Sequence, residues 1–160
     1  MQKKNELIIY TLTVFTAFFM YLITLNPAFH ANDSPETSAC SVTLGVQHPP
    51  GYPLFSVLGK IFTLIPAGSE AFRINLMSSL FMSFAAGFIF LIVIAVSSGA
   101  FAGLIIASMS AFVFSFSYIV WPEALSSKGG IYSLNALFLS AVVYCLVLWQ
   151  KKGKEKMLYM

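Results

Sequence analysis

Two carboxylates three positions apart, Asp33 and Glu36, are the side chains of this sequence best suited to acid–base chemistry. Asp33 could act as a general base toward a hydroxyl group, with Glu36 as a second base, a substrate contact or a metal ligand. Between them lie Ser34 and Pro35, which predict a helix start with Ser34 as its N-cap and Gly45 as its closing residue. A helix start also attracts anions, so the alternative is that both carboxylates only stabilise the helix.

A stiff segment follows, since residues 47–53 read QHPPGYP. Its three prolines fix φ, and its single glycine supplies the only free hinge. His48 could donate a hydrogen bond to a substrate, or it is a solvated or structural side chain of a rigid connector. Tyr52 is a candidate substrate contact, with a seat at the membrane boundary as the alternative.

Lys60 and Arg73 are candidate substrate-binding bases, and Lys128 is a third base of the same kind. Each is close to the end of an apolar run, at the depth where a lipid-linked phosphate would lie. Arg73 is the best placed, because it stands at the mouth of such a run. The alternative for each base is that its side chain only reaches the lipid headgroups.

Membrane helices must position these residues. The 160-residue chain is 58% hydrophobic and only 9% charged, which is too apolar for a soluble domain. A membrane span needs roughly 20 apolar residues. Four charge-free runs approach or exceed that length: residues 7–25, 74–96, 99–121 and 131–149. The sequence therefore predicts an all-α membrane protein with about four transmembrane helices, in a single membrane domain over residues 1–160.

Lysines gather near both ends of the chain, at positions 3 and 4 and between positions 151 and 156. By the positive-inside rule, both termini are expected in the cytoplasm, with residues 150–160 as a cytoplasmic tail at the cytoplasmic (inner) membrane. The alternative for the first run is a cleaved signal peptide, but that run is long for one.

Residues 26–73 then form a large extracytoplasmic loop with short helices near 35–44 and 53–66. The second of these stretches is too short to cross and is interrupted by Lys60, so an interfacial helix is expected there. Asp33, Glu36 and His48 all fall in this loop.

Small residues predict where the helices pack closely. One row recurs at every fourth position of the third run, and a second group lies in the second run, so these two runs are expected to form a tight hairpin. The paired glycines at 129 and 130 allow close backbone approach to another segment. Asn135, inside the fourth run, is expected to hydrogen-bond a neighbouring helix. The two rows are Gly99, Gly103, Ala107 and Ala111, and Ser78, Ser79, Ser83, Ala86 and Gly87.

Other function classes have little support. Cys40 and Cys145 fall at different levels relative to the membrane, so neither a disulfide framework nor a metal cluster is expected. The basic tail is explained by topology and lipid headgroups, and nucleic-acid binding is not indicated. A transporter is disfavoured, because the predicted spans place no ionisable group near the middle of the bilayer.

The order of motifs resembles a known family. Residues 33–36 read DSPE, residues 44–55 read LGVQHPPGYPLF, residues 73–76 read RINL and residues 132–135 read YSLN. This pattern is similar to that of the multi-pass membrane proteins related to protein O-mannosyltransferases, which belong to the GT-C class of glycosyltransferases. The resemblance covers nearly the whole chain, and its most specific mark is the run HPPGYP.

The resemblance implies a GT-C-like N-terminal module that transfers a sugar, with mannose as the candidate, from a polyprenyl-phosphate donor. The acceptor is a hydroxyl of a protein or glycan at the extracytoplasmic face. Asp33 becomes the catalytic base, and no cofactor besides the lipid-linked donor is implied, while a divalent metal requirement stays open. The chain departs from the family at Pro35, where glycine is usual, and at Gly130, where an acid is usual.

Family members are longer than this chain, which is expected to be a fragment of a larger protein. Two alternatives to an active transferase follow: a non-catalytic membrane subunit that uses the same loop to bind a partner or lipid, or a truncated and inactive member of the family.

Overall fold

The computed structural model describes residues 2–29, 33–97 and 101–152. Within them the chain forms seven helices and no strand, which confirms the predicted all-α class. Gly99 and most of the predicted tail lie outside the described residues. The helices are α1 (Gln2–Ile23), α2 (Ser34–Thr43), α3 (Pro53–Thr63), α4 (Glu70–Val96), α5 (Phe101–Ser115), α6 (Val120–Ala124) and α7 (Ser127–Lys152).

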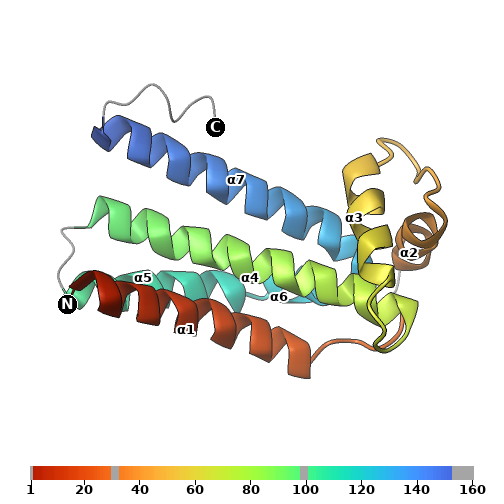
Figure 1. Cartoon of the computed structure of the whole chain (residues 1–160), viewed down its shortest axis with the longest axis horizontal. Coiled ribbons are helices and arrows are strands. Elements are labelled where there is room, and N and C mark those ends of the chain that lie inside the picture. Colours follow the sequence, from red (N-terminus) through yellow and green to blue (C-terminus); the bar gives the residue numbers. More distant parts are fainter. Residues whose placement is uncertain (1, 30–32, 98–100, 153–160) are drawn as a thin grey trace.

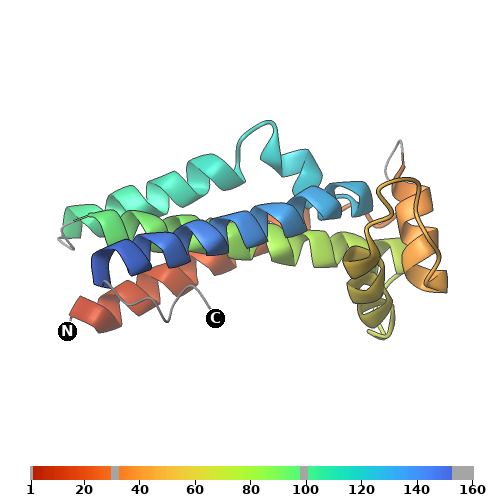
Figure 2. The same cartoon turned by 90° about the horizontal axis from the view of Figure 1, so that it is seen from above.

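The long helices lie side by side around α4, which packs against α1, α5 and α7 (Figure 1). The short helices α2 and α3 lie across one end of this bundle, next to the first turns of α7 (Figure 2). The beginning of α1 and the end of α7 lie at the opposite end (Figure 1). All the candidate loop residues are thus gathered at one end of the bundle.

Three of the described helices are long and apolar enough to cross a membrane: Lys3–Ile23, Glu70–Val96 and Ser127–Lys151. They correspond to the first, second and fourth predicted runs, and they agree with a membrane protein. Their surfaces carry many exposed apolar side chains, as expected of helices that face lipid.

The third predicted run, 99–121, is not one continuous helix. Here α5 ends at Ser115 after 15 residues, a length of roughly 22 Å at 1.5 Å per residue. The Ser117 hydroxyl accepts a hydrogen bond from the Val120 N–H (3.3 Å), and Pro122 has no N–H to continue an earlier helix. These residues start the separate helix α6, which leads the chain on to α7 (Figure 2).

The predicted small-residue packing is confirmed for the described part of the third run. Ala107 and Ala111 of α5 are fully buried in a cluster with Ala86 and Phe90 of α4. Small residues let two helix backbones approach closely. Gly87, by contrast, faces Tyr10 and Val14 of α1, so the small residues of α4 serve more than one neighbour.

Candidate functional site

The beginning of α2 is built differently from its sequence prediction. Asp33, not Ser34, is the N-cap residue, and Ser34 is the first residue of the helix. The Ser34 side chain is fully buried and its hydroxyl accepts a hydrogen bond from the Lys128 N–H at 3.4 Å. The prediction of Ser34 as N-cap was therefore wrong, because its hydroxyl is used to hold α7 and not its own helix end.

The end of α2 also differs slightly from the prediction. The helix stops at Thr43, and Leu44 takes the left-handed conformation (φ 56°) that was expected of a closing glycine. The Gly45 N–H still donates to the Cys40 carbonyl at 2.9 Å, so this glycine pairs one of the carbonyl groups in the last turn of the helix.

Buried hydroxyl groups fasten α2 to the first turn of α7. The Ser38 hydroxyl donates to the Ser127 hydroxyl, which in turn donates to the Ser34 carbonyl, each at 3.0 Å. These serines are at most 1% exposed. Buried polar groups that are fully paired fix one arrangement strongly. This network brings the start of α2, with Asp33, against Lys128.

The paired glycines permit this close assembly. A side-chain carbon on Gly129 would lie 2.1 Å from the Glu123 carbonyl oxygen, and one on Gly130 would lie 2.6 Å from the Phe55 ring. Both distances are shorter than van der Waals contact, so the predicted close approach is confirmed. The family's usual acid at position 130 would not fit here, because Phe55 and the Ser78 hydroxyl fill the space.

Asp33 forms an ion pair with Lys128, whose Nζ lies 2.7 Å from its Oδ2. The Lys128 ammonium donates a hydrogen bond to this carboxylate and thereby holds the pKa of Asp33 below its ordinary value. The Asp33 side chain remains 45% exposed, against 20% for Lys128. Asp33 is therefore an ionised carboxylate that a solute can reach.

Glu36 uses both of its oxygens on His48. Oε1 accepts a hydrogen bond from the His48 N–H, and Oε2 lies 2.7 Å from the ring nitrogen Nδ1. These hydrogen bonds lower the pKa of the Glu36 carboxyl. The other ring nitrogen, Nε2, faces Asp33 Oδ2 at 4.0 Å. Three predicted site residues from two parts of the loop are thus brought together.

Lys60 and Arg73 are engaged elsewhere. Lys60 Nζ donates to the Val42 carbonyl at 2.7 Å, near the end of α2. Arg73 donates to three carbonyls of the α3–α4 connection, those of Thr63, Ala67 and Gly68. Both side chains hold the loop together, and the described structure gives neither an ion pair with Asp33 or Glu36.

Lys128 is the site residue that the sequence prediction left out of the site. It was recognised, with Lys60 and Arg73, as a base at the depth of a lipid-linked phosphate, but it was not named as a site residue. The available signal was its position near the start of the fourth apolar run, which was predicted to begin on the same side of the membrane as the loop. Nothing in the local sequence indicates that its partner is Asp33.

Among the described residues, no group of three or more His, Cys, Asp or Glu side chains is arranged to hold a metal ion.

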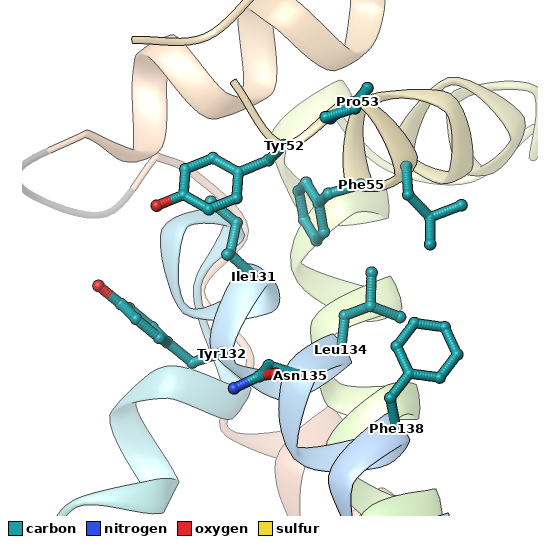
Figure 3. A pocket seen from close by; sticks show the side chains of 9 residues that line it. Tyr52, Pro53, Phe55, Ile131, Tyr132, Leu134, Asn135 and Phe138 are labelled. Atoms are coloured by element: carbon teal, nitrogen blue, oxygen red, sulfur yellow. The ribbon is translucent and has the colours of Figure 1, made fainter. Parts of the chain in front are cut away.

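A groove of about 380 Å³ opens between α3 and α7 beside this cluster (Figure 3). The Tyr52 and Tyr132 hydroxyls lie along one edge, and both rings are close enough to Lys128 to interact with its charge. Phe55, Leu134 and Phe138 form the apolar side. The groove therefore offers a polar edge near Asp33 and an apolar wall that continues along α7.

Two of the residues that line the groove are Tyr52 and Asn135. Tyr52 reaches the groove from a left-handed backbone conformation (φ 41°), which is unusual for a bulky residue. Asn135 is exposed and lies in the groove wall (Figure 3). Within the described residues, Asn135 therefore faces the groove and does not pack against a neighbouring helix as the sequence predicted.

Comparison with known proteins agrees with these motifs. Residues 33–160 match the model of the protein O-mannosyl-transferase TMEM260 N-terminal domain. The chain is 38% identical over 138 residues to protein O-mannosyl-transferase TMEM260 of Mus musculus, which covers 86% of this chain and 19% of the mouse protein. It is 33% identical over 145 residues to the Dictyostelium discoideum protein of the same name, covering 89% of this chain and 17% of that protein.

The chain thus spans about a fifth of the length of these relatives. No solved structure matches it significantly. The family match extends over most of the chain and includes Asp33, Glu36, His48 and Lys128. The predicted resemblance is confirmed, and the chain belongs to the family of the protein O-mannosyl-transferase TMEM260 N-terminal domain.

Proposed function

We propose that this chain is the N-terminal, GT-C-like part of a membrane mannosyltransferase. In this proposal it transfers the sugar from a polyprenyl-phosphate donor to a hydroxyl acceptor at the extracytoplasmic face. The observation that carries the proposal is the Asp33 carboxylate, which is ionised, exposed and held at the loop end of the bundle beside the groove. The names of the relatives support the mannosyl group and a protein acceptor.

Asp33 supplies the base in the proposed reaction. Its free oxygen accepts the proton of the acceptor hydroxyl while that oxygen attacks the anomeric carbon of the sugar. The bond between this carbon and the phosphate oxygen breaks on the opposite side, and the phosphate leaves with the bonding electrons. A phosphate monoester is a good leaving group, so no strong acid is required.

Lys128 has a second part in the same step. While Asp33 is ionised, the two charges neutralise each other across 2.7 Å. When Asp33 takes up the acceptor proton, its charge is lost and Lys128 is left without its anion. The ammonium can then stabilise the negative charge that develops on the departing phosphate.

The groove between α3 and α7 is the proposed seat of the donor's polyprenyl chain. Its exposed apolar residues, Leu54 and Phe138, would contact the chain, while Tyr52 and Tyr132 lie at the end nearer to Lys128. A lipid with a phosphate head has the same division into a polar and an apolar part. Membrane lipids of similar chemistry are expected to compete for this groove.

The arrangement of the helices supports the proposed orientation. The beginning of α1, with Lys3 and Lys4, and the end of α7, with Lys151, lie at the end of the bundle away from Asp33 (Figure 1). By the positive-inside rule, these lysines favour the cytoplasm for that end and the extracytoplasmic side for the loop. The proposed location is the cytoplasmic membrane, with both termini in the cytoplasm.

The decisive experiment replaces Asp33 with Asn in the full-length membrane protein. Transfer of mannose from a polyprenyl-phosphate donor to a Ser/Thr-containing peptide should fall about 10²- to 10⁴-fold, because the base is removed while the shape is kept. Glu70→Gln, an exposed carboxylate in the first turn of α4, is the matched control. Unchanged transfer by Asp33→Asn at normal abundance would favour the non-catalytic subunit.

A further inference from the structure

We propose that His48 and Glu36 form a relay that receives the proton from Asp33 after each transfer. The inference rests on the proposed function, because it begins with a proton that Asp33 has removed from the acceptor. It gives the two residues roles that differ from those expected from the sequence. His48 becomes the onward proton acceptor, and Glu36 becomes the residue that positions His48.

The contacts of Glu36 determine which ring nitrogen of His48 carries a proton. A carboxylate only accepts hydrogen bonds, so the Nδ1 atom 2.7 Å from Glu36 Oε2 must be the donor. In the neutral ring, Nε2 is then left with its lone pair. The second contact, from the His48 N–H to Oε1, ties the backbone to the same carboxylate and restricts rotation of the ring.

This orientation aims the unprotonated nitrogen at Asp33. Nε2 lies 4.0 Å from Asp33 Oδ2, which is within ion-pair range and slightly beyond hydrogen-bonding distance. A lone pair that faces an ionised carboxylate gains nothing from it. The acceptor proton arrives on the other carboxyl oxygen of Asp33, so the carboxyl group must first rotate. Its O–H can then donate to Nε2, and the arrangement suits the state that follows proton abstraction.

The environment of Asp33 supplies the reason for a relay. Lys128 favours the ionised carboxylate, so a proton on Asp33 is weakly held and must move on before the next cycle. An imidazole is intrinsically a stronger base than a carboxylate. Among the described residues, the charged and titratable groups around His48 are Asp33 and Glu36, and beyond Asp33 lie Lys128 of α7, Tyr132 and Tyr52.

The relay step balances without a further reactant. The Asp33 O–H bond breaks and an Nε2–H bond forms, which gives an ionised Asp33 and an imidazolium at His48. The imidazolium then lies between two carboxylates, with Nδ1–H still on Glu36. Since the His48 side chain is 41% exposed, it can release the Nε2 proton to water and return to its starting form. An orienting carboxylate behind an imidazole is the arrangement of catalytic triads.

The test compares His48→Ala with wild type in the full-length protein, with polyprenyl-phosphate mannose as donor and a Ser/Thr-containing peptide as acceptor. We expect kcat to fall about 10- to 100-fold with little change in KM, because proton transfer is impaired and binding is not. Added imidazole should restore much of kcat, since the exposed position leaves room for it. A residue that only holds the loop would show no such rescue.

A second variant guards against misfolding. Glu36→Gln keeps the shape of the side chain but removes the carboxylate that orients His48, so kcat should fall several-fold with little change in KM. Val46→Ala, in the same loop and highly exposed, and Glu70→Gln are the matched controls.

The outcomes separate the relay from the transferase proposal. An inactive Asp33→Asn together with a fully active His48→Ala would overturn the relay alone. A His48→Ala variant that inserts normally, loses activity and is not rescued by imidazole would also overturn it, since His48 would then act as a structural clamp. Full activity of Asp33→Asn would remove the transferase proposal itself.

Discussion

Lys128 joins the membrane helix α7 to the loop that follows α1 through its 2.7 Å contact with Asp33. This ion pair helps to hold the loop on α7 only while Asp33 is ionised. Its contribution to the stability of the folded protein should therefore depend on pH. The folded structure lowers the pKa of Asp33, so the stabilisation is complete above the ordinary carboxyl range and is lost as pH falls through the lowered value.

Lys128→Met should therefore melt at a lower temperature than wild type at about pH 7, and this gap should narrow at a second, lower pH as protonation of Asp33 removes the charge of its carboxylate. Thermal unfolding in detergent at the two pH values measures the difference. Lys128→Arg keeps the charge and serves as the control. A gap between Lys128→Met and wild type that persists unchanged at low pH would mean that packing, and not the ion pair, stabilises this contact.

The buried serine network predicts a stability effect that depends on position within α7. Ser127→Ala removes the partner of Ser38 and of the Ser34 carbonyl, and each loses its hydrogen bond in a buried place. A loss of about 1–3 kcal/mol is expected, with faster amide hydrogen exchange in α2. Ser140→Ala, in the same helix, breaks only bonds within that helix and should cost well under that amount. Equal effects of the two substitutions would contradict the proposed fastening of α2.

The glycine at 130 predicts intolerance of even one added carbon. Gly130→Ala would press a methyl group against the Phe55 ring and the Ser78 hydroxyl, so α3 or α4 must shift away from α7. Overpacking of this kind costs about 1–3 kcal/mol. Gly45→Ala meets its nearest atom at 3.1 Å and should be milder. Thermal stability of the two variants, measured in the same detergent, provides the comparison.

The groove predicts a change in donor recognition that depends on the length of the lipid chain. Leu54→Trp would fill part of the groove, so the KM for a long polyprenyl-phosphate donor should rise several-fold while the KM for a short-chain donor changes less. Val57→Trp adds the same ring to an equally exposed position of α3 that does not line the groove. If both variants respond alike, or if chain length has no influence, the polyprenyl chain lies elsewhere.

Much of the fold follows from local patterns. Charge-free runs of the right length predicted the cores of α1, α4 and α7, and the prolines at 35 and 53 marked the starts of α2 and α3 to within a residue or two. The division of the third run escaped prediction, since the run carries no charge that would mark a break. The break depends on Ser117 and Pro122, whose effects are on backbone hydrogen bonds.

The candidate site was only partly predictable. Asp33, Glu36 and His48 were recognised from residue type and loop position, and the structure brings them together. Their partners were not recognisable, because the contacts of Asp33 with Lys128 and of Ser38 with Ser127 join segments far apart in the chain. Lys60 and Arg73 resembled phosphate ligands for a different reason: their partners are backbone carbonyls of the loop, and a backbone carbonyl is not marked as a partner by any residue type.

Tyr52 occupies a backbone conformation that glycine or asparagine would adopt with less strain, by about 1 kcal/mol. Tyr52→Asn is therefore expected to keep the turn before α3 while removing one of the two tyrosines on the polar edge of the groove. Any screen that ranks variants by heat resistance alone would favour such a replacement. Thermostabilised forms of this protein should accordingly be checked at position 52 before their ligand binding is interpreted.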